Sequence, residues 1–137
     1  MVEESSSFIA YRFRRVLVPV VPQPHAEQAI AVAVELATHY GSRPTFLYVA
    51  QSESDPSIET VRRMVESRAQ GIDYEFKVRV LKRGETPASE IVKELSETHY
   101  DLVIMSTRGY YGVAALIYES TSIAVALASN TSVLILR

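Results

Sequence analysis

The chain has 137 residues, of which 47% are hydrophobic and 22% are charged, and its formal net charge is -2 at pH 7. This length suits a single domain with one core, and the small negative charge provides no overall attraction for nucleic acid or an anionic membrane surface. Cysteine is absent, which excludes disulfide bonds, zinc-thiolate sites and thiol nucleophiles.

The first segment of the chain, MVEESSSFIAYRF, is acidic and serine-rich and has no apolar stretch after a basic start. It therefore does not have the pattern of a signal peptide. No stretch of the sequence approaches the roughly 18 apolar residues that a membrane-spanning helix needs. We expect a cytoplasmic protein without a membrane partner, in which residues 1–11 form a flexible tail and residues 12–137 form one domain.

Five segments of the sequence are expected to form strands. Four are short, nearly continuous apolar runs, which are typical of strands covered on both faces. The third in order alternates instead, with apolar residues on one side and Glu75, Lys77 and Arg79 on the other. One wet face is typical of a strand at or near a sheet edge. The expected strands are residues 15–21, 45–50, 74–80, 102–105 and 132–136.

Between these strands, apolar residues recur at three-to-four spacing, which predicts amphipathic helices. Asp55 and Thr86 can each cap a helix, and each is followed by a proline, which suits the first helical turn. The expected helices begin near Ala26, Pro56, Pro87 and Ser122. In the third helix, the residues expected to face inward are Ala88, Ile91, Val92 and Leu95.

Five strands that alternate with four helices indicate βαβ units and a parallel sheet covered on both faces. Ligands of such sheets bind beyond the carboxyl ends of the strands, where the strand order reverses. We therefore expect functional residues in the loops after Val20 and after Met105.

The chain contains, in this order, the stretches RVLVPV (15–20), GETPASEIV (84–92), DLVIMSTRG (101–109) and SVLILR (132–137). Together they resemble the universal stress protein (UspA) family, and the resemblance covers nearly the whole chain from about Arg14. It implies an α/β fold of the Rossmann-like, adenine nucleotide alpha hydrolase-like type. This fold has a five-stranded parallel sheet in the order 3-2-1-4-5 with helices on both faces, so the alternating strand would form one edge.

The other edge would be the last strand, which is apolar and nearly free of charge. An uncovered edge of this kind invites pairing with another chain, and members of the family commonly form homodimers through it. A monomer whose edge is blunted by Arg137 or by the N-terminal tail is the alternative. The expected dimer interface consists of Val133, Leu134, Ile135 and Leu136.

Nucleotide-binding members of the family carry the pattern G-x2-G-x9-G-[ST] directly after the fourth strand. The glycines let the backbone approach phosphate oxygens, and hydroxyl and N–H groups at the next helix start complete an anion site. On this sequence the four positions fall on Ser106, Gly109, Glu119 and Ser120. At about 4 Å, the Glu119 carboxylate would repel phosphate by roughly 1 kcal/mol in water and about 4 kcal/mol at an effective dielectric near 20. A divalent cation that bridges the two could offset this repulsion.

Two further positions depart from the pattern of the binding members. These members have an acidic residue after the first strand, in a V-P-x-D context, that contacts the nucleoside, and Val21 stands there in this chain. Ser106 adds a side chain in place of glycine, although its hydroxyl can still donate to phosphate. The candidate nucleotide-binding residues are Pro19, Val20, Val21, Val49, Met105, Ser106, Arg108, Gly109, Glu119, Ser120, Thr121 and Ser122.

Several of these candidates also have purely structural interpretations. Arg108 can clamp a phosphate, but it can equally pair with an acid such as Glu119. The hydroxyl cluster of Ser120, Thr121 and Ser122 can form a plain helix N-cap instead of a phosphate site. The three histidines lie far apart, and no zinc, EF-hand, Walker or nucleophile-elbow pattern occurs, so we expect no metal site and no catalytic residue.

The sequence favours a non-catalytic, homodimeric regulatory domain of the stress response with a degenerate nucleotide-binding loop and no cofactor. Such a domain would act through contacts with an unidentified protein partner. The alternative is a stress sensor that still binds ATP or AMP, weakly or with Mg2+. Slow ATP hydrolysis stays open as a third interpretation, because a fold does not fix a function.

Overall fold

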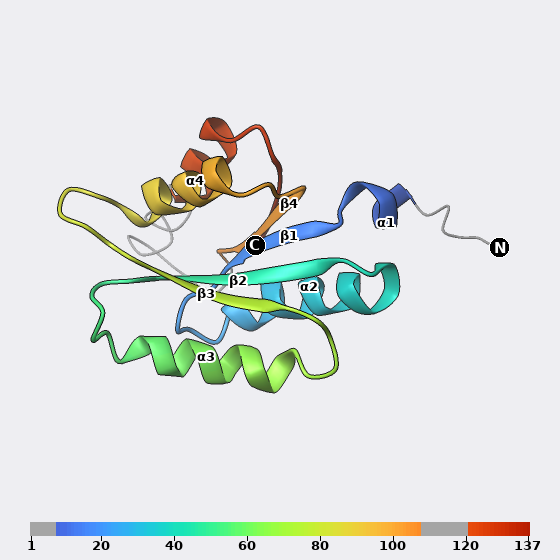
Figure 1. Cartoon of the computed structure of the whole chain (residues 1–137), viewed down its shortest axis with the longest axis horizontal. Helices are drawn as coiled ribbons and strands as arrows, with labels where there is room; N and C mark the ends of the chain where they lie inside the picture. Colours follow the sequence, from blue (N-terminus) through green and yellow to red (C-terminus); the bar gives the residue numbers. More distant parts are fainter. Residues whose placement is uncertain (1–7, 108–120) are drawn as a thin grey trace.

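A computed structural model describes residues 8–107 and 121–137 of the chain (Figure 1). Residues 121–128 are helical and are called the C-terminal helical segment below. The other elements, in chain order, are α1 (Phe8–Arg12), β1 (Arg15–Pro19), α2 (Ala26–Tyr40), β2 (Arg43–Ala50), α3 (Ser57–Arg68), β3 (Glu75–Val80), α4 (Pro87–Glu97), β4 (Leu102–Ser106) and β5 (Ser132–Leu136).

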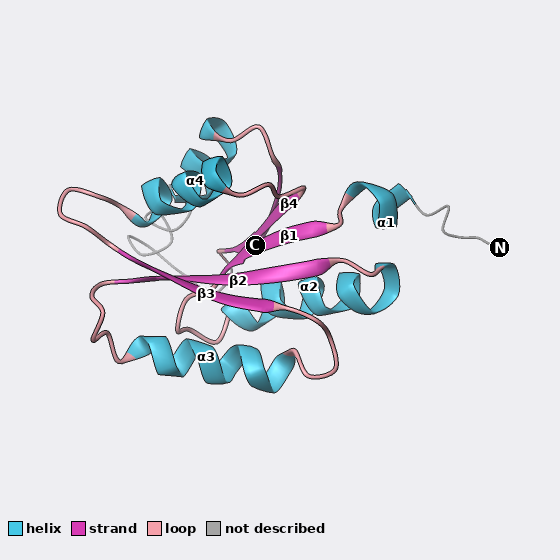
Figure 2. Cartoon of the chain, in the orientation of Figure 1, coloured by secondary structure: helices cyan, strands magenta, loops and turns pink. Residues whose placement is uncertain are grey.

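The five strands form one sheet in the order β3-β2-β1-β4-β5, and every neighbouring pair is parallel. The fold predicted from the sequence is therefore confirmed, and β3 and β5 are the two edges. The order reverses beside β1, because the chain moves outward through β2 and β3 before β4 pairs with the other side of β1 (Figure 2). A parallel sheet of this kind opens a crevice at that point, beyond the carboxyl ends of β1 and β4.

Helices cover both faces of the sheet. Helices α2 and α3 lie on one face, and α4 lies on the other face with the C-terminal helical segment (Figure 1). Alternate residues of the central strands pack into the two layers: Val16 and Val18 belong to the core under α2 and α3, whereas Leu17 belongs to the core under α4. Burial on both faces explains why β1 is apolar at consecutive positions instead of alternating.

The observed boundaries differ from the expected ones at a few places. Strand β1 was expected to reach Val21 but ends at Pro19, because the chain turns into a proline-containing loop. Strand β2 begins two residues earlier than expected, at Arg43, whose N–H donates to the Arg14 carbonyl at 2.7 Å. Residues 8–11, which were expected in the flexible tail, belong to helix α1, and residues 1–7 lie outside the described residues.

Helix α4 begins as the sequence predicts, with Thr86 as its N-cap. The Ser89 N–H donates to the Thr86 hydroxyl at 3.1 Å, and the Thr86 N–H donates to the Ser89 hydroxyl at 3.0 Å. This reciprocal pair forms a capping box and satisfies two backbone donors that the first helical turn leaves without partners. The cap fixes Pro87 as the first residue of the helix and therefore places Ile91 about one turn later.

Two acids of α4 are buried beside its apolar face, and they pair with the basic side of β3, which is less exposed to solvent than the alternating sequence predicted. Glu94 is fully buried and accepts hydrogen bonds from Lys77 at 2.8 Å, from Arg79 at 2.6 Å and from the Tyr100 hydroxyl at 2.8 Å. Glu90 is 3% exposed and accepts a hydrogen bond from Arg79 at 3.0 Å. The inward-facing residues that the sequence predicted, Ala88, Ile91, Val92 and Leu95, do pack in the cluster under α4. The two buried acids were not predicted, because their basic partners on β3 are distant in the sequence.

Candidate functional site

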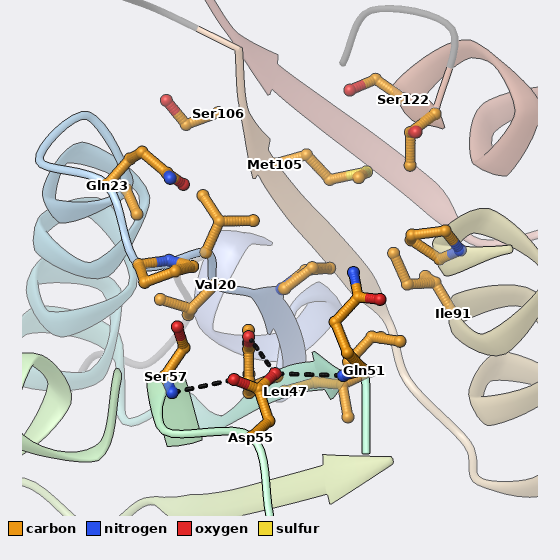
Figure 3. Close-up of a pocket in the computed structure, with 18 residues that line it drawn as sticks. Val20, Gln23, Leu47, Gln51, Asp55, Ser57, Ile91, Met105, Ser106 and Ser122 are labelled. Carbon is orange, nitrogen blue, oxygen red and sulfur yellow. Dashed lines mark hydrogen bonds between the residues drawn. The ribbon is translucent and has the colours of Figure 1, made fainter. Parts of the chain in front are cut away.

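A cavity of about 420 Å³ opens at the carboxyl end of the sheet (Figure 3). Its volume lies within the range of pockets that hold small molecules. The ends of β1, β2 and β4, the loops after β1 and β2, and the starts of α2, α3, α4 and the C-terminal helical segment contribute to it. The lining residues are Pro19, Val20, Val21, Pro22, Gln23, Ala26, Leu47, Tyr48, Val49, Gln51, Asp55, Ser57, Pro87, Ile91, Met105, Ser106, Thr121 and Ser122.

The cavity brings together the candidate residues that the structure describes. From the ends of three strands come Pro19, Val49 and Met105, which lie far apart in the sequence. The other described candidates at the cavity are Val20, Val21, Ser106, Thr121 and Ser122. The remaining candidates, Arg108, Gly109, Glu119 and Ser120, lie outside the described residues.

Ser106 links the two loops that meet at the crevice. Its hydroxyl donates to the backbone carbonyl of His25 at 3.2 Å, which ties the end of β4 to the chain segment just before α2. The next residue, Thr107, donates its N–H to the Leu136 carbonyl at 2.8 Å. The first position of the loop pattern, Ser106, is thus held by contacts within the protein. At His25, the acceptor of the Ser106 bond, burial lowers the pKa of the side chain, because an apolar environment disfavours the charged imidazolium.

Val21 makes the loop after β1 an apolar part of the wall. It is half-buried and packs against the core under α2 and α3. The two prolines of this loop, Pro22 and Pro24, each fix their own φ angle and remove one backbone donor. At this side of the cavity, the chain therefore presents hydrocarbon where an acidic residue would present a hydrogen-bond acceptor.

Asp55 is the lining residue that the sequence analysis interpreted incompletely. Its position before Pro56 predicts a helix cap, and its Oδ1 does accept the Ser57 N–H at 2.9 Å. Its Oδ2 also accepts the Gln51 N–H at 3.0 Å and the Tyr48 hydroxyl at 2.8 Å, as the dashed lines in Figure 3 show. These donors, with the Gln51 amide first, stabilise the carboxylate and lower the pKa of Asp55.

Nine further lining residues were not among the sequence candidates. They belong to the loop before α2 and the start of α2, to β2 and the loop after it, and to the first turns of α3 and α4. The rule that ligands bind at the carboxyl ends of strands applies to the loop after β2 as well. The sequence could have indicated Gln51 and Asp55, because both lie in the loop that follows β2. It could not indicate which of the side chains in that loop point toward the cavity. The residues are Pro22, Gln23, Ala26, Leu47, Tyr48, Gln51, Ser57, Pro87 and Ile91.

A smaller hollow of about 280 Å³ includes the polar residues His99 and Asp101, close to the amino end of β4. Asp101 accepts hydrogen bonds from the N–H groups of Arg14 and Arg15 and lies 2.9 Å from His99. These contacts hold the start of β1 beside the start of β4, which is a structural role. Among residues 8–107 and 121–137, no group of three metal-ligating side chains comes together, and no helix is long and apolar enough to cross a membrane.

Comparisons with known proteins agree with this fold. A model of the universal stress protein family matches residues 12–137. A solved universal stress protein in complex with cAMP is 21% identical, with a TM-score of 0.75, and the match covers 92% of this chain and 98% of that one. The universal stress protein from Archaeoglobus fulgidus in complex with dAMP is 18% identical, with a TM-score of 0.64 and coverages of 92% and 99%.

The universal stress protein UspA from Lactobacillus plantarum is 19% identical, with a TM-score of 0.66, and the match covers 92% of this chain and 99% of that chain. No curated protein matches this sequence significantly. At these identities the solved structures establish a shared fold and leave the ligand of this chain to be argued from its own residues.

Proposed function

Because the chain belongs to the universal stress protein family, we propose that it is a non-catalytic regulatory domain whose cavity has lost much of the phosphate recognition of nucleotide-binding members. The observation that carries this proposal is the hydrogen bond from the Ser106 hydroxyl to the His25 carbonyl. Ser106 occupies the position of the first glycine in the phosphate-binding pattern. Its hydroxyl proton is donated to a carbonyl of the protein and not to a phosphate oxygen.

Val21 supports the same conclusion on the nucleoside side of the cavity. Nucleotide-binding members have an acidic contact after the first strand, and here a half-buried valine lines the cavity at that position. A polar ribose or base edge placed against hydrocarbon gives up its hydrogen bonds to water without replacement, which is unfavourable. Loss of an anchor at each end of the ligand would weaken nucleotide binding more than loss of either one.

The lining also favours binding over catalysis. Asp55 is the one acidic side chain among the described lining residues, and its lowered pKa makes it a weak base near neutral pH. Its two oxygens already accept three hydrogen bonds that hold the loop between β2 and α3. This carboxylate is therefore suited to structural support and to contact with a ligand, and poorly suited to activating a nucleophile.

Isothermal titration calorimetry with ATP and AMP, with and without Mg2+, tests the proposal. We expect no saturable binding tighter than about 50 μM, which corresponds to a binding free energy of about −6 kcal/mol. Nucleotide retained through purification, detected after acid extraction, would contradict it directly.

A restored site provides the matched gain-of-function test. The variant Ser106→Gly with Glu119→Gly and Val21→Asp recreates the positions at which the sequence departs from the binding pattern. We expect it to bind ATP at least about tenfold more tightly than the native chain, a gain of about 1.4 kcal/mol. If the native chain does not bind and this variant gains nothing, the proposed reason for lost binding is wrong.

A sensor that retains ATP or AMP binding is the second candidate function. The observation that favours it is the fold shared with the solved proteins in complex with cAMP and dAMP, together with an open cavity at the carboxyl end of this chain's sheet. Binding that appears only when Mg2+ is present would support this candidate, because a cation bridging Glu119 and phosphate offsets their repulsion.

We also propose that the domain forms a homodimer through strand β5. This strand pairs with β4 on one side and is the edge of the sheet on the other. Leu134 at its centre is 38% exposed, and the C-terminal helical segment that precedes it exposes Ile123 and Leu127. An apolar edge strand next to exposed apolar side chains supports pairing between two copies related by a two-fold axis.

Sedimentation velocity over a range of protein concentrations tests the dimer. Leu134→Lys places a charge in the proposed interface and is expected to shift the protein to monomer. The matched control is Tyr40→Lys, because Tyr40 is 37% exposed and lies on α2, away from β5. A Leu134→Lys protein with the association state of the native chain would count against pairing through this strand.

A further inference from the structure

The charges of the cavity lining bear on the kind of ligand that the cavity can hold. Among the described residues that line it, Asp55 is the one charged side chain, and lysine and arginine are absent from that lining. A site built for a phosphate or carboxylate ligand is expected to place a cationic side chain or several free N–H groups toward it. The described part of this cavity instead presents one fixed negative charge.

Three donors fix the direction of that charge. The Tyr48 hydroxyl and the Gln51 N–H both bond to Oδ2 of Asp55, whereas the Ser57 N–H bonds to Oδ1. The Ser57 hydroxyl also contributes a hydrogen bond that lowers the pKa of Asp55, so the negative charge of the carboxylate, and not an unused acceptor site, is what attracts a donor group of a ligand. The loop contacts hold the carboxylate before any ligand arrives, which lowers the entropic cost of binding to it.

The remainder of the wall is mainly hydrocarbon. Residues from β1, β2, α4 and β4 contribute apolar side chains from several directions (Figure 3). An anion that enters such a cavity loses hydration and also meets a like charge, and both effects oppose binding. A neutral or cationic group that donates to Asp55 meets neither obstacle. The apolar wall residues that matter most here are Val20, Val21, Leu47, Val49, Ile91 and Met105.

We propose that the cavity binds a neutral or singly cationic, mainly apolar small molecule whose hydrogen-bond donor faces Asp55, and that it rejects anions of the same shape. Asp55 is then the residue that determines specificity by charge. The inference rests on the proposed function, because it assigns to the same cavity a ligand class that needs no phosphate recognition.

A pair of probes that share one ring system tests the charge preference. Tryptamine and indole-3-acetate both carry an indole, but their side arms are cationic and anionic at neutral pH. Calorimetric titration of the full chain should show saturable binding of tryptamine that is at least about tenfold tighter than that of indole-3-acetate, a difference of about 1.4 kcal/mol. Equal affinities, or no saturable binding of tryptamine, would overturn the inference.

The Asp55→Asn variant tests whether this residue is the cause. We expect the ratio of the two affinities to fall to within about twofold, because the amide keeps an acceptor oxygen but carries no charge. The matched control is Glu53→Gln, which removes a carboxylate from the same loop at a residue that does not line the cavity. The control should keep the native ratio, and a native ratio in Asp55→Asn would assign the selectivity elsewhere.

A second variant decides the question if Asp55→Asn fails to fold. Gln51 is exposed and lines the cavity, so Gln51→Lys adds a cation there and keeps the backbone N–H that donates to Asp55. It should raise the affinity for indole-3-acetate at least about fivefold, or about 1 kcal/mol, and an unchanged affinity would overturn the inference. Tight ATP binding would refute the proposed function, regardless of the affinities for the two indole probes. Weak nucleotide binding together with equal affinities for tryptamine and indole-3-acetate would refute this inference alone.

Discussion

The two faces of the sheet are closed by different physical means. Under α2 and α3, the buried cluster consists of aliphatic and aromatic side chains such as Val18, Ile30 and Phe46. Under α4, the apolar cluster formed by the described residues is smaller, and two acids, Glu90 and Glu94, are buried beside it with their basic partners. The first face depends on the area that it removes from water, whereas the second depends on every charge keeping its partner.

This difference matters for the cavity, because its walls come from both layers. Ala26 of α2 and Ile91 of α4 both line it. Lys93, also on α4, contacts Glu85 at 3.1 Å just before the helix begins, and these charges help to set where the α4 wall lies. We therefore expect changes to the ion pairs to affect the cavity as well as stability.

The largest effect is expected from Glu94→Ala. This change leaves Lys77 and Arg79 without the fully buried carboxylate that they share. Breaking a buried ion pair by removing one partner typically costs about 3–5 kcal/mol, and we expect a loss of this size in the free energy of unfolding measured by urea denaturation.

Two controls place this loss in context. Ile30→Val trims one methylene group from the apolar face, where Ile30 is fully buried, and should cost about 0.5–1.5 kcal/mol. Glu59→Ala removes an exposed carboxylate that pairs with Arg62 and Arg63 on α3 and should cost less than about 1 kcal/mol. If Glu94→Ala costs no more than Glu59→Ala, the buried ion pairs do not hold α4 as proposed.

Acid is expected to weaken the α4 face before the α2 and α3 face. Burial alone would raise the pKa of Glu94, but hydrogen bonds from Lys77, Tyr100 and Arg79 outweigh it, so the pKa lies below its ordinary value of 4.5. A depressed folded-state pKa gives stability that is fully present above the unfolded value and is lost as the pH falls through the folded one.

The free energy of unfolding should therefore decline as the pH falls below about 4.5, and the decline should be shallower in Glu94→Gln than in the native chain. Urea titrations at several pH values from about 7 to about 3 measure both slopes. The Ile30→Val protein should follow the native slope, because it changes no titrating group. A native stability that stays flat over the acidic range would contradict this account.

The smallest effect is expected from Thr86→Ala at the start of α4. Loss of the capping hydroxyl removes the partner of the Ser89 N–H, and such a change typically costs about 1 kcal/mol. Thr86→Ser keeps the hydroxyl and should stay within about 0.5 kcal/mol of the native chain by the same urea assay. An equal loss in both variants would indicate that the threonine methyl group, and not the cap, is responsible.

Much of the fold follows from short-range patterns in the sequence. The strand at 132–136, the cap at Thr86 and the edge position of the alternating strand were all predicted and agree with the structure. The expected site residues that the structure describes do line one cavity. The role of Asp55 was only partly predicted, because its bonds to Tyr48 and Gln51 depend on how the loop folds back over β2.

The sequence by itself determined which segments form strands and helices, since side-chain periodicity and capping residues act over a few positions. It also determined the absence of thiol chemistry. Only the tertiary structure decided that Lys77 and Arg79 meet two buried acids, that Ser106 bonds to the chain before α2, and that one carboxylate lies in an apolar cavity. These contacts join residues that are distant in sequence, and their geometry depends on how helices pack on the two faces of the sheet.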